Sequence, residues 1–240
     1  MEINKNYRIL AASTSTVYGS GYLEYILDDA VKFLQADEIL FIPYARPSGV
    51  AYEEYIEAPR KAFAKKDILV RGIHESDNPK EAILNAKAIF TGGGNTFLLL
   101  KTLCEMDLIE TLKTVVAKGI PYMGSSAGSN LTGLTIGTTN DMPIVYPPSF
   151  EALGFLPFNI NPHYLDPDLN STHKGETRET RIKEFHKFNL QPVLGLREGS
   201  WLEVQNGEIE LKGKLTARLF RQNQQPVELE SGKVGEYLNG

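Results

Sequence analysis

The sequence predicts an α/β fold in which a mostly parallel β-sheet is covered by helices on both faces. Short apolar runs alternate with helical patterns through the first half of the chain, which is the succession typical of βα units. One of these runs ends in the glycines of 91–97, at the strand ends where a parallel sheet forms its ligand crevice. The 240 residues contain no internal repeat or linker, so a single domain over residues 1–240 is expected.

The expected elements follow one another in regular order up to residue 126. Strands are predicted at 7–13, 38–45, 68–74, 87–93 and 120–126, and helices at 20–35, 53–67, 79–86 and, as one helix or two, 95–119. Pro59 is expected to kink the second helix or to shift its start. The second half is less regular, with an amphipathic helix at 175–189 and a β-meander at 192–214 that turns at Asn206-Gly207.

Composition excludes several classes of function. The net charge is −5 and the charges are interspersed, so nothing indicates a nucleic-acid surface. Cys104 is the only cysteine, which rules out an internal disulfide or a cysteine-based metal site and fits a reducing compartment. No stretch has the roughly 20 apolar residues of a membrane span, and the N-terminus lacks the apolar run of a signal peptide. We therefore expect a cytoplasmic protein with neither nucleic-acid nor membrane partners.

The stretch from Gly124 to Gly128, GSSAG, matches the G-x-S-x-G pattern of a nucleophile elbow. It follows a predicted strand and precedes a segment that can begin a helix, as an elbow requires. Small residues are needed two positions before and two after the nucleophile, and only Ser126 has glycines at both distances. The alternative is that these small residues only allow a tight turn. In an elbow, the amide of Ala127 would stabilise an oxyanion, together with the amide of Gly93 or Gly94 from the TGGGNTF run.

A serine nucleophile requires a base and a carboxylate that orients the base. Of the four histidines, His163 is favoured over His173, because it follows an apolar segment and a proline that fixes the local backbone. Two carboxylates are candidates for the acid. Asp141 lies in a turn rich in small polar residues, and Glu198 follows an apolar strand. The residues alone do not separate the two.

Together these segments resemble the peptidase E family, the α-aspartyl dipeptidases among the serine peptidases. The matching segments are, in order, GGGNTF (92–97), GSSAGSNL (124–131), TTNDMPIV (138–145), NINPHY (159–164), HKGETRETRI (173–182) and GLREGSW (195–201). The resemblance implies a fold related to class I glutamine amidotransferases. It also implies cleavage of dipeptides with an N-terminal aspartate (Asp-Xaa), without metal or cofactor. Where the family often has tryptophan before the nucleophile, this chain has Ser125, which is expected to alter the pocket wall.

By position, the resemblance implies specific roles for the site residues. Ser126 is implied as the nucleophile and His163 as the base, with Gly94 and Ala127 as oxyanion donors. Asp141 and Glu198 both remain candidates for the acid, with Asp141 placed first. Arg178 is implied as the partner of the substrate's aspartyl side chain, because an arginine fork binds a carboxylate through two parallel hydrogen bonds.

Two other functions remain alternatives. A cyanophycinase-like serine peptidase would share the elbow, and a non-catalytic module could bind a small anion at the glycine-rich loop. The length of the chain and the HKGETR segment favour the dipeptidase over the first. The presence of Ser126, His163 and both carboxylates counts against the second. Either a monomer or a homodimer is compatible with the sequence.

Overall fold

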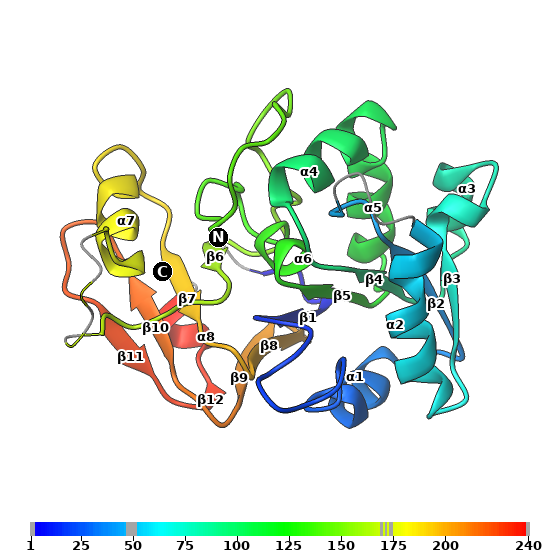
Figure 1. The fold of residues 1–240 in the computed structure, drawn as a ribbon, viewed down its shortest axis with the longest axis horizontal. Coiled ribbons are helices and arrows are strands. Elements are labelled where there is room, and N and C mark those ends of the chain that lie inside the picture. The colour runs from blue at the N-terminus through cyan, green and yellow to red at the C-terminus, as the bar shows by residue number, and fades with distance from the viewer. Residues whose placement is uncertain (1–2, 47–51, 169, 171, 173–174, 239–240) are drawn as a thin grey trace.

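The computed structural model describes residues 3–46, 52–168, 170, 172 and 175–238. Its main feature is an eight-stranded sheet (Figure 1). In spatial order the strands are β12 (Gly232–Lys233), β9 (Glu208–Gly213), β8 (Ser200–Gln205), β1 (Arg8–Ala12), β5 (Tyr122–Ser125), β4 (Ile89–Thr91), β2 (Glu38–Ile42) and β3 (Leu69–Gly72). The five strands from β1 to β3 are parallel, whereas β8, β9 and β12 are antiparallel. The predicted mostly parallel α/β fold is therefore confirmed.

Helices cover both faces of this sheet, as the sequence predicts. The helices α1 (Leu27–Leu34) and α2 (Tyr52–Ala64) share one apolar cluster, and α3 (Pro79–Leu84), α4 (Thr96–Glu105) and α5 (Ile109–Ala117) share the other. Side chains alternate along β1, because successive residues of a strand point to opposite faces. Ile9 and Ala11 lie in the second cluster, and Leu10 and Ala12 lie in the first. Figure 1 shows α1 below the sheet, and α4 and α5 above it.

A smaller, four-stranded sheet lies beside the antiparallel half of the main sheet (Figure 1). Its order is β11 (Val227–Leu229), β10 (Ala217–Phe220), β7 (Val193–Leu196) and β6 (Asn159–Asn161), with α7 (Arg178–Phe185) packed against it. The expected meander at 192–214 is therefore wrong in part. The hairpin of β8 and β9 forms at Asn206-Gly207, but the chain leaves β7 through Gly199, at φ 86°, and enters the other sheet. A short 3-10 turn (Ile73–Glu75), α6 (Ala127–Asn130) and α8 (Gly235–Leu238) complete the described elements.

One helix begins later than expected, and the structure decides two points that the sequence left open. The helix predicted from residue 20 begins only at Leu27, because Leu23 adopts a left-handed conformation at φ 55°. The segment 95–119 forms two helices, separated where Asp107 turns at φ 53°. The helix α2 begins at Tyr52 and runs through Pro59, whose ring is part of its buried face. Among the described residues, none of the helices combines the length and apolarity that crossing a bilayer requires.

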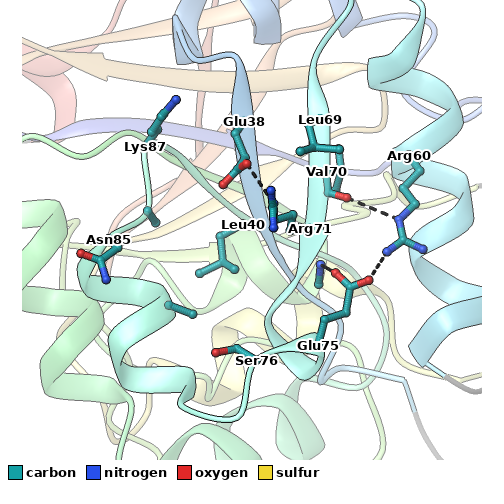
Figure 2. A pocket seen from close by; sticks show the side chains of 13 residues that line it. Glu38, Leu40, Arg60, Leu69, Val70, Arg71, Glu75, Ser76, Asn85 and Lys87 are labelled. Carbon is teal, nitrogen blue, oxygen red and sulfur yellow. Dashed lines mark hydrogen bonds and ion pairs between the residues drawn. The ribbon is translucent and has the colours of Figure 1, made fainter.

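Side chains bind two of the outward backbone groups of β3, a strand at the edge of the sheet. The outward polar groups of an edge strand are free to pair with a second chain unless something covers them. In β3, the carbonyl of Val70 accepts a hydrogen bond from Arg60 Nε (3.4 Å), and the amide of Gly72 donates to Glu75 Oε2 (2.5 Å). Arg60 and Glu75 also form an ion pair with each other, as Figure 2 shows. We call these two side chains the β3 clamp.

The β3 clamp borders a cavity of about 680 Å³ that also contacts α3 and β2 (Figure 2). The other charged side chains of its lining are paired within the protein. Arg71 Nε lies 2.9 Å from Glu38, and Lys87 Nζ lies 2.7 Å from Asp37. Among the described residues that line it, every charged side chain therefore already has a partner, which disfavours a site for a charged ligand. The candidate chemistry lies instead at the carboxyl ends of β5 and β4.

Candidate active site

Ser126 occupies a sharp turn between β5 and α6. Its backbone has φ 52° and ψ −109°, a strained conformation for a residue other than glycine. Three hydrogen bonds hold it. The Ser126 amide donates to the carbonyl of Ala12 (3.1 Å), and the Ser126 carbonyl accepts from the amides of Ser129 (3.0 Å) and Asn130 (2.9 Å). This strand–turn–helix geometry is that of the predicted nucleophile elbow.

The glycines on either side of Ser126 allow backbone segments to approach closely. A Cβ atom at Gly124 would lie 2.4 Å from the carbonyl oxygen of Gly128, and a Cβ at Gly128 would lie 2.2 Å from the carbonyl oxygen of Thr91. Real Cβ atoms do not come so near to backbone atoms. The spacing of small residues in the motif therefore has a direct steric cause, which is that α6 packs onto β5 and β4 without intervening side chains.

The other two serines of this stretch have different environments. Ser125 lies opposite Ala12 in the sheet and is fully buried, so its side chain is in the interior rather than on an open pocket wall. Ser129 is also buried, and its hydroxyl donates to the carbonyl of Ala12 (2.6 Å). Only Ser126 among the three has a half-buried side chain at the mouth of the site.

The structure brings Ser126, His163 and Glu198 into one hydrogen-bonded chain. Nε2 of His163 lies 2.8 Å from Ser126 Oγ, and Nδ1 lies 2.6 Å from Glu198 Oε1. This is the arrangement of a nucleophile, a base and a carboxylate that orients the base. Two of the remaining histidines have other partners: His74 contacts Glu53, and His186 contacts the carbonyl of Gln191. His173, the rival candidate for the base, lies outside the described residues.

His163 is held by contacts that the sequence analysis missed. It adopts a left-handed conformation at φ 51°, and its amide donates to Ser13 Oγ (2.9 Å). The hydroxyl of Ser13 in turn donates to the carbonyl of Leu196 (2.7 Å), which also accepts the amide of Tyr164 (3.1 Å). Ser13 follows directly after β1, and its place as a polar residue at the carboxyl end of a parallel strand is the signal that could have identified it.

Arg197 ties the segment that carries Glu198 to the segment that follows His163. Its guanidinium forms two hydrogen bonds with Asp166 (2.7 Å each) and also binds Glu228 (3.0 Å). The Arg197 guanidinium also lies over the ring of Tyr164, 5.5 Å from its centroid. Hydrogen bonding to Arg197 lowers the pKa of Asp166 below its ordinary value, and the pKa of Glu228 is lowered as well. Asp166 and Glu228 therefore both stay charged at neutral pH. The backbone on both sides of the His163–Glu198 contact is thereby fixed.

Asp141 lies at the start of α4 rather than beside His163. Its Oδ2 accepts hydrogen bonds from the amide of Thr96 (2.7 Å), the hydroxyl of Thr96 (2.6 Å) and the hydroxyl of Thr139 (3.0 Å). A carboxylate at a helix N-terminus is stabilised by the free amides there. Oδ1 of Asp141 accepts no hydrogen bond from the described residues, and the side chain is half-buried.

The glycine-rich loop after β4 lies against the elbow. A Cβ atom at Gly93 would lie 3.1 Å from Ser126 Cβ, so the loop is in close contact with that side chain. Gly94 adopts φ 139°, which a side chain would disfavour. Within the part of the chain that the structure describes, the amides of Gly94 and Ala127 donate to no other group. Both are therefore available to a bound molecule.

Arg178, the first residue of α7, lines a cavity of about 410 Å³ together with Asn140 and Arg181. Burial lowers the pKa of the Arg178 guanidinium, and the positive charge of Arg181 acts in the same direction, whereas Asp141 opposes them. Arg178 forms no ion pair with any described residue. The amide of Asn140 donates to the carbonyl of Pro162 (2.5 Å), which places this cavity next to His163.

A smaller cavity of about 50 Å³ adjoins the first and is lined by Arg178, Asn140 and Asn161. Asn161 is buried, and its amide donates to Asn140 Oδ1 (2.7 Å). Its own Oδ1 has no hydrogen-bond partner among the described residues. A buried polar atom without a partner is unusual, and the residue that carries it lines a cavity together with the half-buried Arg178. No group of His, Cys, Asp or Glu side chains in the described ranges is arranged to hold a metal ion.

Comparisons with known proteins identify the family of the chain. The model of peptidase family S51 matches residues 9–212. The chain is 51% identical to the peptidase E of Streptomyces coelicolor, over 93% of this chain and 91% of that protein. It is 46% identical to a probable alpha-aspartyl dipeptidase of Drosophila melanogaster, over 89% of each.

Solved structures show the same fold at lower identity. A putative peptidase E from Listeria monocytogenes superposes with a TM-score of 0.66 at 22% identity, covering 87% of this chain and 99% of that one. A peptidase from an acI-B1 actinobacterium gives a TM-score of 0.70 at 16% identity, covering 96% of both chains. The fold expected from the sequence, of the class I glutamine amidotransferase type, is therefore confirmed.

The close approach at Gly128 leads to a stability prediction. Gly128→Ala forces a methyl group onto the carbonyl of Thr91, and we expect the free energy of unfolding to fall by at least about 2–3 kcal/mol, as for an overpacked core. Gly154→Ala is the matched control. Gly154 has φ 64° but open space around its Cβ position, so only a backbone cost of about 1–2 kcal/mol is expected. Urea unfolding measures both, and a smaller loss at Gly128 than at Gly154 would contradict the steric argument.

Proposed function

This chain belongs to peptidase family S51 and is a serine peptidase, and we propose that it hydrolyses dipeptides with an N-terminal aspartate through an acyl-enzyme. The observation that carries the proposal is the hydrogen-bonded chain from Ser126 through His163 to Glu198. The similarity to an alpha-aspartyl dipeptidase over 89% of the chain supports the substrate class. A cytoplasmic setting, in which Cys104 stays a free thiol, is part of the same proposal.

In the first half of the reaction, His163 takes the hydroxyl proton of Ser126 at Nε2 while Oγ attacks the carbonyl carbon of the aspartyl residue. Glu198 accepts a hydrogen bond from the Nδ1–H of His163 and stabilises the imidazolium that forms. The negative charge on the tetrahedral intermediate is stabilised by the amides of Gly94 and Ala127. His163 then gives its proton to the leaving amino group, and the C–N bond breaks.

In the second half, water replaces the amino acid that has left. His163 removes a proton from this water as it attacks the aspartyl ester on Ser126. The negative charge on the second tetrahedral intermediate is stabilised by the same two amides, those of Gly94 and Ala127. When it collapses, the proton on His163 returns to Ser126 Oγ and free aspartate is released.

The charges of an N-terminal aspartyl residue have complementary partners near this serine. The side-chain carboxylate suits Arg178, which lines a cavity beside His163 and is unpaired among the described residues. The α-ammonium group suits Asp141, whose Oδ1 is unoccupied and whose charge acts on Arg178. We therefore assign Asp141 to substrate binding and Glu198 to the catalytic triad. A non-catalytic module or a cyanophycinase-like enzyme is not favoured by the hydrogen-bonded triad together with the relatives' names.

The direct test is steady-state hydrolysis of Asp-Leu beside Glu-Leu, Ala-Leu and β-Asp-Leu. We expect Asp-Leu to be cleaved preferentially, and Ser126→Ala to lower kcat by at least about 10⁴-fold, as removal of a serine nucleophile does elsewhere. Ser129→Ala is the control for a nearby serine outside the reaction. Equal rates on Ala-Leu would remove the proposed specificity, and full activity of Ser126→Ala would remove the proposed nucleophile.

The roles of Glu198 and Asp141 can be distinguished by the kinetic effects of their substitution. Glu198→Gln is expected to lower kcat by about 10²–10⁴-fold with little change in KM, because the carboxylate acts on His163 during the reaction. Asp141→Asn is expected instead to weaken discrimination between Asp-Leu and succinyl-Leu, which lacks the α-amino group. If Glu198→Gln keeps the wild-type kcat while Asp141→Asn loses it, the assignment of the triad acid is reversed.

The role of Arg178 is tested by its neutral substitute. Arg178→Met should reduce kcat/KM for Asp-Leu by about 30- to 1000-fold, since it leaves a carboxylate unpaired in a partly dry pocket. Activity on Asn-Leu, which has no side-chain charge, should change far less. Lys183→Met, on the same helix and paired with Glu179, is the matched control. An equal loss of kcat/KM on Asp-Leu and Asn-Leu would show that Arg178 does not recognise the side-chain charge of the substrate.

A further inference from the structure

The Gly93–Gly94 peptide group is contacted by a tyrosine from the helix α2. The hydroxyl of Tyr55 donates a hydrogen bond to the carbonyl of Gly93 (2.9 Å), and the Tyr55 side chain is buried. In a trans peptide group the C=O and N–H bonds point in opposite directions. The amide of Gly94 therefore points away from Tyr55, in the loop that contacts Ser126 through Gly93.

We propose that Tyr55 is a positioning residue for the oxyanion site, in which its hydroxyl orients and polarises the Gly93–Gly94 peptide group so that the Gly94 amide is a stronger donor toward the oxyanion. The inference rests on the proposed function, because it requires a serine attack that generates an oxyanion at this loop. It assigns a role in the reaction to a residue outside the triad and the oxyanion donors themselves.

Hydrogen-bond cooperativity gives the physical reason. A hydrogen bond accepted by the carbonyl of a peptide group increases the positive charge on the amide hydrogen of the same group, and condensed-phase estimates give about 10–30% strengthening per bond. Preorganised donors also stabilise a developing charge without having to reorient during the reaction. Tyr55 supplies both effects, since its rigid ring holds the hydroxyl at one place behind the peptide group.

The surroundings of Tyr55 keep the hydroxyl in the donating role. Burial raises the pKa of the Tyr55 phenol above its ordinary value, so the group carries its proton throughout the neutral pH range. The ring is held between an edge-on contact with Phe41, at 5.3 Å between centroids, and the guanidinium of Arg46, 4.5 Å from the ring centroid. The nearby positive charge of Arg46 makes the phenol a better hydrogen-bond donor without removing its proton.

The glycines of the loop fit around this hydroxyl. A Cβ atom at Gly92 would lie 2.3 Å from the Tyr55 hydroxyl oxygen, so only glycine there lets the tyrosine reach the next carbonyl. On the other side, a Cβ at Gly94 would lie 2.2 Å from the carbonyl oxygen of Ala45, which also accepts the amide of Asn95 (2.6 Å). The Gly93–Gly94 peptide group therefore lies between close contacts with Ala45 on one side and Tyr55 on the other.

The test compares Tyr55→Phe with Tyr44→Phe. The first removes only the hydroxyl that binds Gly93. The second removes a phenol hydroxyl from another buried ring, one that donates to no group in the described part of the chain. For each variant we would measure kcat and KM for Asp-Leu and inhibition by free aspartate. We would also measure the rate at which a fluorophosphonate labels Ser126, a step in which the Oγ–P bond forms, fluoride leaves and His163 takes the proton. Thermal unfolding checks that both variants are folded.

We expect Tyr55→Phe to lower kcat and the labelling rate by a similar factor, about 3- to 20-fold for a weakened oxyanion donor, which is less than the 10²–10³-fold loss on removing one. KM and aspartate inhibition should stay near the wild-type values, as should all the constants of Tyr44→Phe. Wild-type rates of labelling and turnover in Tyr55→Phe would overturn the role of Tyr55. A loss that appears equally in aspartate binding would show a merely structural effect and would overturn it as well.

The two proposals fail in different ways in this experiment. Labelling of Ser126 does not depend on the preference for aspartate, and the Ser126→Ala variant measures the background labelling. A wild-type protein that is labelled at Ser126 but does not cleave Asp-Leu contradicts the proposed substrate while still measuring the effect of Tyr55→Phe. A wild-type protein that is not labelled contradicts both the nucleophile and the inference that depends on it.

Discussion

The site depends first on the contact between backbone segments at the elbow, where Gly128 rests on the carbonyl of Thr91 and Gly124 lies under the carbonyl of Gly128. This contact leaves no room for side chains between α6 and the strands β4 and β5. The turn between them must therefore be sharp, and Ser126 takes the strained conformation that a sharp turn requires. The conformational strain at Ser126 is offset by the packing of α6 against α4 and the neighbouring strands, which form a continuous apolar cluster. The direction of the serine hydroxyl is in this sense a result of core packing.

The partner of that hydroxyl comes from a different part of the structure. His163 follows β6 and Glu198 follows β7, neighbours in the smaller sheet, whereas Ser126 follows β5 in the larger one. Ser13, at the end of β1, joins the two sheets, because its hydroxyl accepts the amide of His163 and donates to the carbonyl of Leu196. The distance between the Ser126 hydroxyl and the His163 imidazole is set by this junction. Arg197, bonded to Asp166 and Glu228, keeps the far side of the junction from opening.

The sequence alone was enough to predict the parallel sheet, the elbow geometry around Ser126 and the choice of His163 as the histidine beside it, because each of these depends on local rules. Apolar runs of strand length separated by helical periods define the sheet, and glycines at two fixed distances define Ser126. The choice between Asp141 and Glu198 could not be made in the same way. Asp141 lies in a turn and Glu198 follows a strand, and neither position shows whether the fold brings the carboxylate to a histidine or to the start of α4. Tyr55 had no local signal at all, since its hydroxyl meets Gly93 only after α2 has packed on the sheet.

The β3 clamp has a consequence for how copies of this protein can associate. A growing β-sheet adds a chain by offering its unpaired amides and carbonyls, and on β3 the carbonyl of Val70 and the amide of Gly72 are already taken by Arg60 and Glu75. An incoming strand would have to break an ion pair and two backbone contacts to pair with these two groups. The sheet is in effect terminated at this end by two side chains rather than by a covering helix. These contacts disfavour pairing of a second chain with this edge of the sheet.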